Sequence, residues 1–175
     1  LGMPLYAARV KGDGVVAVHI SGALSSTLGV AEHAAAGVGG AVRVIDSKSA
    51  AMGTGFVALA AARAARDGAS LDDVAGQAES TVGRVSAYLV VQRLENLRRS
   101  GRIGTAASWL GTALALKPLL RLDDGQLVLA QRVRTTSKAT AAMVEQVLDV
   151  VGEGRAALAV HHVDNPAGAA EVAAT

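Results

Sequence analysis

Hydrophobic residues dominate two short stretches near the start of the chain. The runs VVAVHI, residues 15–20, and AVRVID, residues 41–46, are rich in β-branched residues and follow glycine-containing segments. A helical pattern from Leu24 to Ala36 lies between them. Mainly apolar strands separated by a helix are typical of a βαβ unit with a parallel sheet. We therefore predict an α/β fold of two packed α/β domains, the first a parallel βαβ-type sheet with flanking helices.

Two further helices complete this first domain. One runs from Ala50 to Arg66 and ends at Asp67-Gly68. The other follows Ser70, a hydroxyl N-cap with carboxylates in the next turn, and runs to about Gly83. We place the first domain at residues 1–84. Because the chain opens with Leu rather than Met, we expect a fragment whose first domain is incomplete at its start.

The second half has a different topology, a mixed sheet with helices. We place this second domain at residues 85–175 and expect it to be incomplete at its end. Asp124-Gly125 is a strong hairpin turn signal. From Ser137 to Val151, apolar residues at spacings of three and four predict a one-sided helix. The other expected elements are a strand at 85–91, a short basic helix at 92–102, two strands within 118–133, a strand at 157–160 and a helix opening at Pro166.

Composition narrows the function classes. The chain of 175 residues is 51% hydrophobic and 18% charged, which is enough to bury a core. It has no cysteine, so disulfides, thiolate zinc sites and cysteine nucleophiles are excluded. A net charge of +2 and a small aromatic content argue against nucleic-acid binding. No apolar run reaches the roughly 20 residues of a bilayer crossing, so we expect a cytoplasmic protein with no stable membrane insertion.

Four hydroxyl residues follow the first predicted strand, at Ser21, Ser25, Ser26 and Thr27. A helix N-terminus offers unpaired N–H groups and a positive dipole end, so this turn suits an anionic ligand. One of these hydroxyls can equally serve as an ordinary helix cap without any ligand. The residues alone leave both interpretations open.

The arginines of RLENLRRSGRIG form a second candidate feature. Arg93, Arg98, Arg99 and Arg102 lie within ten residues, and guanidinium groups suit carboxylates and phosphates. Such runs are usually solvated helix faces, but a carboxylate ligand or an acidic protein partner also fits. Arg102 differs from the others because it follows Gly101 and leaves the helix.

Other motifs are weaker. Gly53, Gly55 and Ala58 match a dinucleotide fingerprint, but DSKSAAM separates them from the strand and no acidic residue follows at the expected place. No spacing supports a metal, no G-x-S-x-G elbow surrounds a serine, and the histidines are best explained as structural. We predict no catalytic residue, cofactor or metal.

Three segments, in order, resemble those of the DegV family over about residues 15 to 165. HISGALSSTLGVA resembles the family's I-S-S-x-L-S-G-T-Y, and VIDSKSAAMGTGFVALAAARAARDGASLDDV resembles V-x-D-S/T-x-x-x-S/T-x-G-x-G with the helices after it. LENLRRSGRIG and LKPLLRLDDGQL resemble L-x-x-L-x-x-G-G-R-I and K-P-I/L-L. On these segments the chain is identified as a member of the family.

The resemblance implies a two-domain α/β protein that encloses one long-chain fatty acid, its acyl chain in an apolar tunnel and its carboxylate near the interdomain surface. Such proteins are the lipid-binding subunit of a bacterial fatty-acid kinase, whose separate catalytic subunit phosphorylates the carboxylate to an acyl phosphate. The implied role is not enzymatic. Apolar helices at 53–65 and 106–116 are candidates to line the tunnel.

The family motifs also imply site residues. The serine of L-S-G-T falls on Ser25, which would hydrogen-bond the carboxylate, and the arginine of G-R-I falls on Arg102, near the same head group. Gly22 stands where the family has serine and Ser26 where it has glycine, so Ser26 would narrow the head-group site or add a donor. The expected ligand-binding residues are Ser25, Ser26, Thr27 and Arg102.

Two family elements have no counterpart in the chain. These are the N-terminal T-S-Q-P-type segment, with a carboxylate-binding threonine, and the C-terminal H-T-G-P-G segment, with a histidine beside the acyl phosphate site. His162 matches a different segment, H-A-D-x-P, and inherits no such role. We expect the chain to start after the first element and stop before the second.

Two rivals to fatty-acid binding remain open from the sequence. One is an enzyme acting on a small phosphorylated or nucleotide ligand at the strand–helix crevice. The other is an interaction module whose arginine cluster docks an acidic partner without a ligand.

Overall fold

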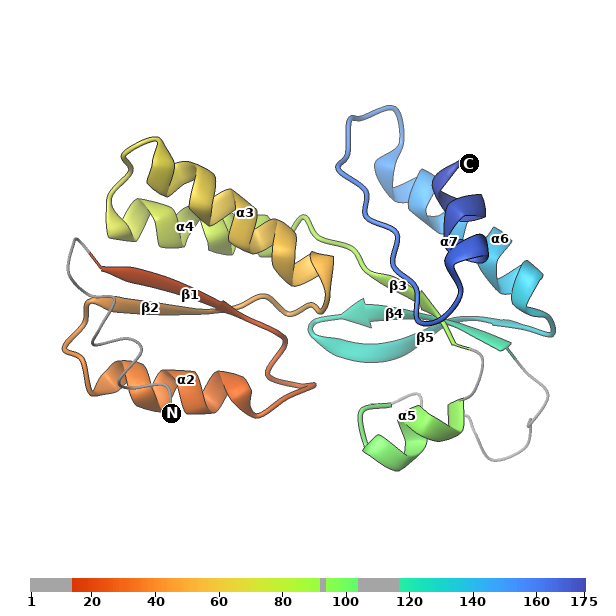
Figure 1. The fold of residues 1–175 in the computed structure, drawn as a ribbon, viewed down its shortest axis with the longest axis horizontal. Coiled ribbons are helices and arrows are strands. Elements are labelled where there is room, and N and C mark those ends of the chain that lie inside the picture. Colours follow the sequence, from red (N-terminus) through yellow and green to blue (C-terminus); the bar gives the residue numbers. More distant parts are fainter. Residues whose placement is uncertain (1–13, 92–93, 104–116) are drawn as a thin grey trace. The chain divides into compact units, whose positions relative to one another are not determined.

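The computed structural model of the protein describes residues 14–91, 94–103 and 117–175 (Figure 1). The chain divides into two compact units, Leu1–Ala87 with Leu122–Leu127, and Tyr88–Arg121 with Val128–Thr175. The turn of a hairpin late in the sequence thus belongs to the first unit. The domain limits of 1–84 and 85–175 stay a prediction.

A parallel pair of strands forms the centre of the first unit. Strands β1 (Val15–His19) and β2 (Val42–Asp46) align with Val15 opposite Val42 and His19 opposite Asp46. Helix α2 (Thr27–Ala36) makes the crossover between them. Because the strands are parallel, their carboxyl ends lie at one edge of the sheet.

Helices cover both faces of this sheet. Helix α2 lies on one face, and helices α3 (Met52–Arg66) and α4 (Leu71–Val82) lie together on the other (Figure 1). The core on the α3–α4 side contains Ile45, Val57 and Ala78, the last two with no exposed surface. Ala31, Ala34 and Val42 form the core on the α2 side. The predicted α/β class with flanking helices is confirmed.

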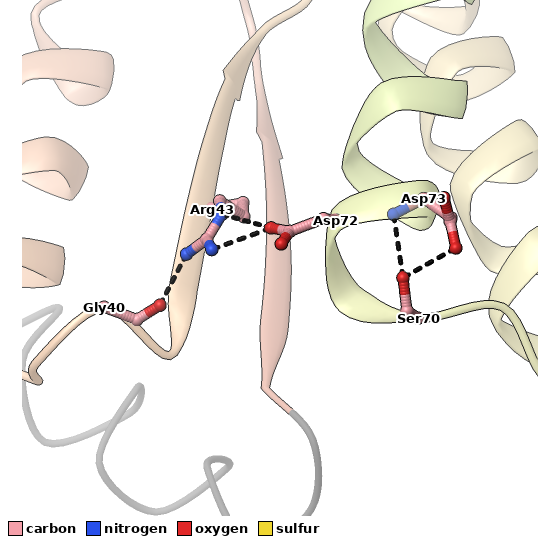
Figure 2. Close-up of polar contacts among 5 residues, drawn as sticks. All are labelled: Gly40, Arg43, Ser70, Asp72 and Asp73. Carbon is pink, nitrogen blue, oxygen red and sulfur yellow. Dashed lines mark hydrogen bonds and ion pairs between the residues drawn. The ribbon is translucent and has the colours of Figure 1, made fainter.

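Helix α4 begins as the sequence predicts. The Ser70 hydroxyl accepts a hydrogen bond from Asp73 N at 3.2 Å and donates to the Asp73 carboxylate at 2.7 Å (Figure 2). Arg43 on β2 donates from Nη2 and Nε to the Asp72 carboxylate at 2.7 and 3.1 Å and also reaches the Gly40 carbonyl. The Arg43–Asp72 pair links the first turn of α4 to strand β2.

The second unit contains most of a three-stranded sheet in the order β3-β4-β5. Strand β3 (Tyr88–Val90) is antiparallel to β4 (Lys117–Asp123), and β4 turns at Asp124-Gly125 into β5 (Gln126–Val133). Leu119, Leu120 and Ala139 are buried. The helices of this unit are α5 (Leu94–Ser100), α6 (Thr136–Val151) and α7 (Pro166–Ala173).

Two expected elements differ from the structure. The segment expected as a strand from Ala157 to Val160 is irregular, with Leu158 68% exposed. A strand needs a ladder partner as well as apolar residues, and local composition does not supply one. Helix α2 begins at Thr27 rather than Leu24, because the residues before it form a tight turn.

Candidate functional site

The loop after β1 divides the four hydroxyl residues into two groups. Ser21 is 1% exposed, and its hydroxyl donates to the Gly125 carbonyl at 2.7 Å and accepts from Ala23 N at 3.2 Å. This hydroxyl thus donates one hydrogen bond and accepts one inside the protein. The other three hydroxyl residues lie further along the loop, at the start of α2.

Ser25 and Thr27 form a hydroxyl pair at the N-terminus of α2. Their side-chain oxygens lie 3.1 Å apart, and Thr27 N donates to Ser25 Oγ at 3.3 Å. Ser26 is the N-cap residue, but its side chain makes no capping hydrogen bond. Ser26 and Thr27 are exposed and Ser25 is half-buried. The structure therefore presents this pair to solvent at the positive end of a helix dipole.

The loop after β2 lies beside the loop after β1. The Asp46 carboxylate accepts from Lys48 N at 2.8 Å through Oδ1 and from Gly22 N at 3.3 Å through Oδ2, so one side chain bridges the two loops. Their juxtaposition follows from the shared edge at the carboxyl ends of parallel strands. Sequence reasoning did not single out Asp46, although its place at the end of a strand was visible.

The Asp124-Gly125 turn contacts both loops within the first unit. Gly125 accepts from Ser21, and the Lys48 ammonium forms an ion pair with the Asp124 carboxylate. The hydrogen bond with Asp124, and then its charge, raise the pKa of Lys48 above its ordinary value. The sequence predicted the turn, but no local signal indicated which residues it would contact.

Two arginines of the cluster, Arg98 and Arg99, pair with one carboxylate on the same helix. Arg98 donates to Glu95 at 2.7 and 3.0 Å through two nitrogens, and Arg99 donates to it at 3.2 Å. The hydrogen bond from Arg98 lowers the pKa of Glu95. These i,i+3 and i,i+4 pairs are those of a solvated helix face.

Arg102 has left the helix, as expected, and its side chain is exposed. Its Nη1 donates to the Ser100 carbonyl at 2.7 Å. Arg102 belongs to the second unit and Ser25 to the first, so a shared head-group site remains a prediction. Arg93 and the expected tunnel helix at 106–116 lie outside the described residues.

The dinucleotide fingerprint has a packing explanation. Gly53 and Gly55 lie inside α3, after the loop that separates this helix from β2. A Cβ at Gly53 would overlap the Ser49 hydroxyl and approach Val85 Cγ1 to 3.2 Å. Gly53 is therefore required by its neighbours, without any ligand.

Of the two adjacent histidines after the segment expected as a strand, one makes a local structural contact. His161 and His162 are exposed, and His162 Nδ1 accepts from Asn165 N at 3.2 Å just before α7. Across residues 14–91, 94–103 and 117–175, no group of three or more His, Cys, Asp or Glu could hold a metal ion. No helix in these ranges is both long and apolar enough to cross a membrane.

Comparisons with known proteins agree on one family. The family model described as "Uncharacterised protein, DegV family" matches residues 4–175. A DegV domain-containing protein of Mycobacterium tuberculosis is 65% identical over 163 residues, covering 93% of this chain and 58% of that protein. The chain thus spans little more than half the length of such curated relatives.

Two solved structures are also similar. A DegV family protein from Corynebacterium glutamicum has a TM-score of 0.80 at 41% identity, covering 86% of this chain and 59% of that one. A DegV family protein from Thermus thermophilus, whose structure is described as one of fatty acid binding, has a TM-score of 0.79 at 35% identity and covers 86% and 54% of the two chains. The chain belongs to the DegV family.

Proposed function

We propose that this protein binds one long-chain fatty acid, with the acyl chain in an apolar tunnel and the carboxylate held by polar side chains. Fatty-acid binding by the related protein from Thermus thermophilus supports this proposal. Each methylene removed from water contributes about 0.8 kcal/mol, so the acyl chain supplies most of the affinity. The polar residues then fix where the head group lies.

The Ser25–Thr27 hydroxyl pair carries the proposal for the head group. Each hydroxyl has one proton and can turn it toward a carboxylate, at the expense of the bond between the two side chains. Both lie at the first turn of α2, whose dipole favours negative charge. Ser26 supplies a third hydroxyl at the same helix start. Arg102 completes the proposed set as a cation near the carboxylate.

The proposed role is presentation rather than catalysis. In this role the bound carboxylate is offered to a separate kinase subunit, which transfers a phosphoryl group to it and forms an acyl phosphate. We place this function in the cytoplasm. Incubating the loaded protein with the kinase subunit and ATP, then trapping with hydroxylamine, should give a fatty hydroxamate only when both proteins are present.

Denaturing extraction of the purified 175-residue chain, followed by mass spectrometry for lipids, tests the binding function. Near-stoichiometric fatty acid would support the proposal and give the chain length. If none is recovered, titration with hexadecanoic acid decides whether the empty protein binds it. Absence of both, together with thermal protection by phosphate or a nucleotide, would contradict fatty-acid binding and favour an enzyme acting on a small phosphorylated ligand.

A further inference from the structure

Ser21 is a junction between three segments that are distant in sequence. Its hydroxyl donates to the Gly125 carbonyl, 104 residues away, and its backbone N donates to the Ser49 carbonyl at 2.9 Å. Its own carbonyl accepts from Leu24 N at 3.0 Å and from Ser25 N at 3.1 Å. The loop that carries Ser25 is therefore hydrogen-bonded to a residue that is itself held by two other segments.

The hairpin turn has the shape needed for this contact. Asp124 and Gly125 both have positive φ, 45° and 81°, and Gly125 is buried. A Cβ at Gly125 would overlap the Ser21 hydroxyl. Only a glycine therefore brings the turn's backbone carbonyl this close to Ser21.

A second contact holds the same turn. Lys48 pairs with Asp124 through its ammonium, while its backbone N donates to the Asp46 carboxylate. The other oxygen of Asp46 accepts from Gly22, the residue after Ser21. The turn and the two strand-exit loops thus form a closed set of contacts around the base of the Ser25 loop.

We propose that Ser21 is a positioning residue for the head-group site: clamped by the Asp124-Gly125 turn, it sets the position of the Ser25–Thr27 hydroxyl pair without touching the ligand. This inference rests on the proposed fatty-acid function. Ser21 acts through the hydrogen bond that its carbonyl accepts from Ser25 N, which closes the short turn of residues 21–25. The Asp124-Gly125 turn serves the site although it lies far from it in sequence.

Ser21→Ala in the 175-residue chain tests the proposal by two measurements. The first is hydrogen exchange of the Leu24 and Ser25 amides, whose acceptor is the backbone carbonyl that alanine retains. Losing a buried, satisfied hydrogen bond should speed their exchange by about ten-fold. The second is titration with hexadecanoic acid, in which Kd should rise by a similar factor.

Ser49→Ala is the matched control. Ser49 is buried to a similar degree, at 3% exposure, and among the described residues its hydroxyl is the buried side-chain group without a hydrogen-bond partner. Removing it deletes a hydroxyl from the neighbouring loop without releasing the turn. Exchange at Ser25 and the Kd should stay at their wild-type values.

A double-mutant cycle separates positioning from general destabilisation. If Ser21 acts through the Ser25–Thr27 pair, Ser21→Ala should raise Kd by a smaller factor in the Ser25→Ala variant than in the wild-type chain. Independent effects that multiply would overturn the proposal. Lys48→Met changes an exposed side chain, so it tests the same contacts without disturbing the core. It should speed exchange of the Leu24 and Ser25 amides, but by a smaller factor than Ser21→Ala does.

The outcomes also separate this inference from the function on which it rests. Unchanged loop exchange in Ser21→Ala would overturn the positioning role, and so would faster exchange with an unchanged Kd. If the wild-type chain binds no hexadecanoic acid, the proposed function fails, and the role of Ser21 in a fatty-acid site fails with it. Faster exchange would then show only that the Asp124-Gly125 turn restrains the loop after β1.

Discussion

Replacing Gly125 with alanine should destabilise the first unit through two separable costs. Gly125 has a φ of 81°, and placing alanine in the left-handed region costs about 1–2 kcal/mol. The added Cβ would also overlap the Ser21 hydroxyl and lie 3.5 Å from Lys48 Cα. Overpacking of this kind costs about 1–3 kcal/mol more. The expected total loss of unfolding free energy is therefore about 2–5 kcal/mol.

Gly68→Ala is the matched control for the backbone cost alone. Gly68 lies in the same unit and has a similar φ of 85°, but a Cβ there would meet nothing within 4 Å. Its substitution should cost only about 1–2 kcal/mol. The difference between the two variants then measures the contact with Ser21.

Urea unfolding followed by far-UV circular dichroism gives the two free energies. Adding Ser21→Ala to Gly125→Ala removes the overlapping hydroxyl, so the double variant should be less destabilised than the sum of the single variants. Equal losses for Gly125→Ala and Gly68→Ala, or simple additivity of the double variant, would refute the argument that the close approach to Ser21 requires glycine at position 125.

Three further results are expected. Ser25→Ala should raise the Kd for hexadecanoic acid by about ten-fold through one lost charge-assisted hydrogen bond. Ser80→Ala, at an exposed hydroxyl on α4, should leave the Kd unchanged, and equal Kd values in titrations of the two variants would contradict the head-group assignment. Ser70→Ala removes the α4 cap and should lower the unfolding free energy by about 1 kcal/mol in urea titration, and an unchanged midpoint would argue against the cap. The folded-state pKa of Glu95 lies below its ordinary value of 4.5, so pairing with Arg98 stabilises α5 above pH 4.5, and this contribution is lost as the pH falls through the folded-state pKa. NMR titration should show the lowered pKa, and Arg98→Ala should return it toward 4.5.

Much of the local structure followed from the sequence because its causes are local. The Ser70 cap needs a hydroxyl and an amide three residues apart, and the structure has that bond. The Asp124-Gly125 turn follows from the ease with which these residues adopt positive φ. The arginine cluster was open to three interpretations, yet Glu95 lies three and four residues before Arg98 and Arg99, so the pairing was within reach of spacing rules.

Other features depended on partners that a local pattern cannot name. The segment Ala157–Val160 has apolar residues suited to a strand but is irregular, since a strand exists only where a second one offers its hydrogen bonds. The four hydroxyl residues after β1 are neighbours in sequence, but the structure separates them into a buried residue and a group at the start of α2. Ser21 faces inward to the hairpin turn, while Ser25 and Thr27 form the outward pair.

The sequence by itself determined the α/β class, the family and the order of most helices and strands, because periodicity, caps, turns and motifs are written in neighbouring residues. Only the tertiary structure decided what Ser21 does. Its partner Gly125 lies 104 residues away, and a hydrogen bond over that separation exists only after β1, β2 and the hairpin turn have been brought together by packing. A hydroxyl that the sequence grouped with a candidate ligand site makes a buried structural contact with the hairpin turn.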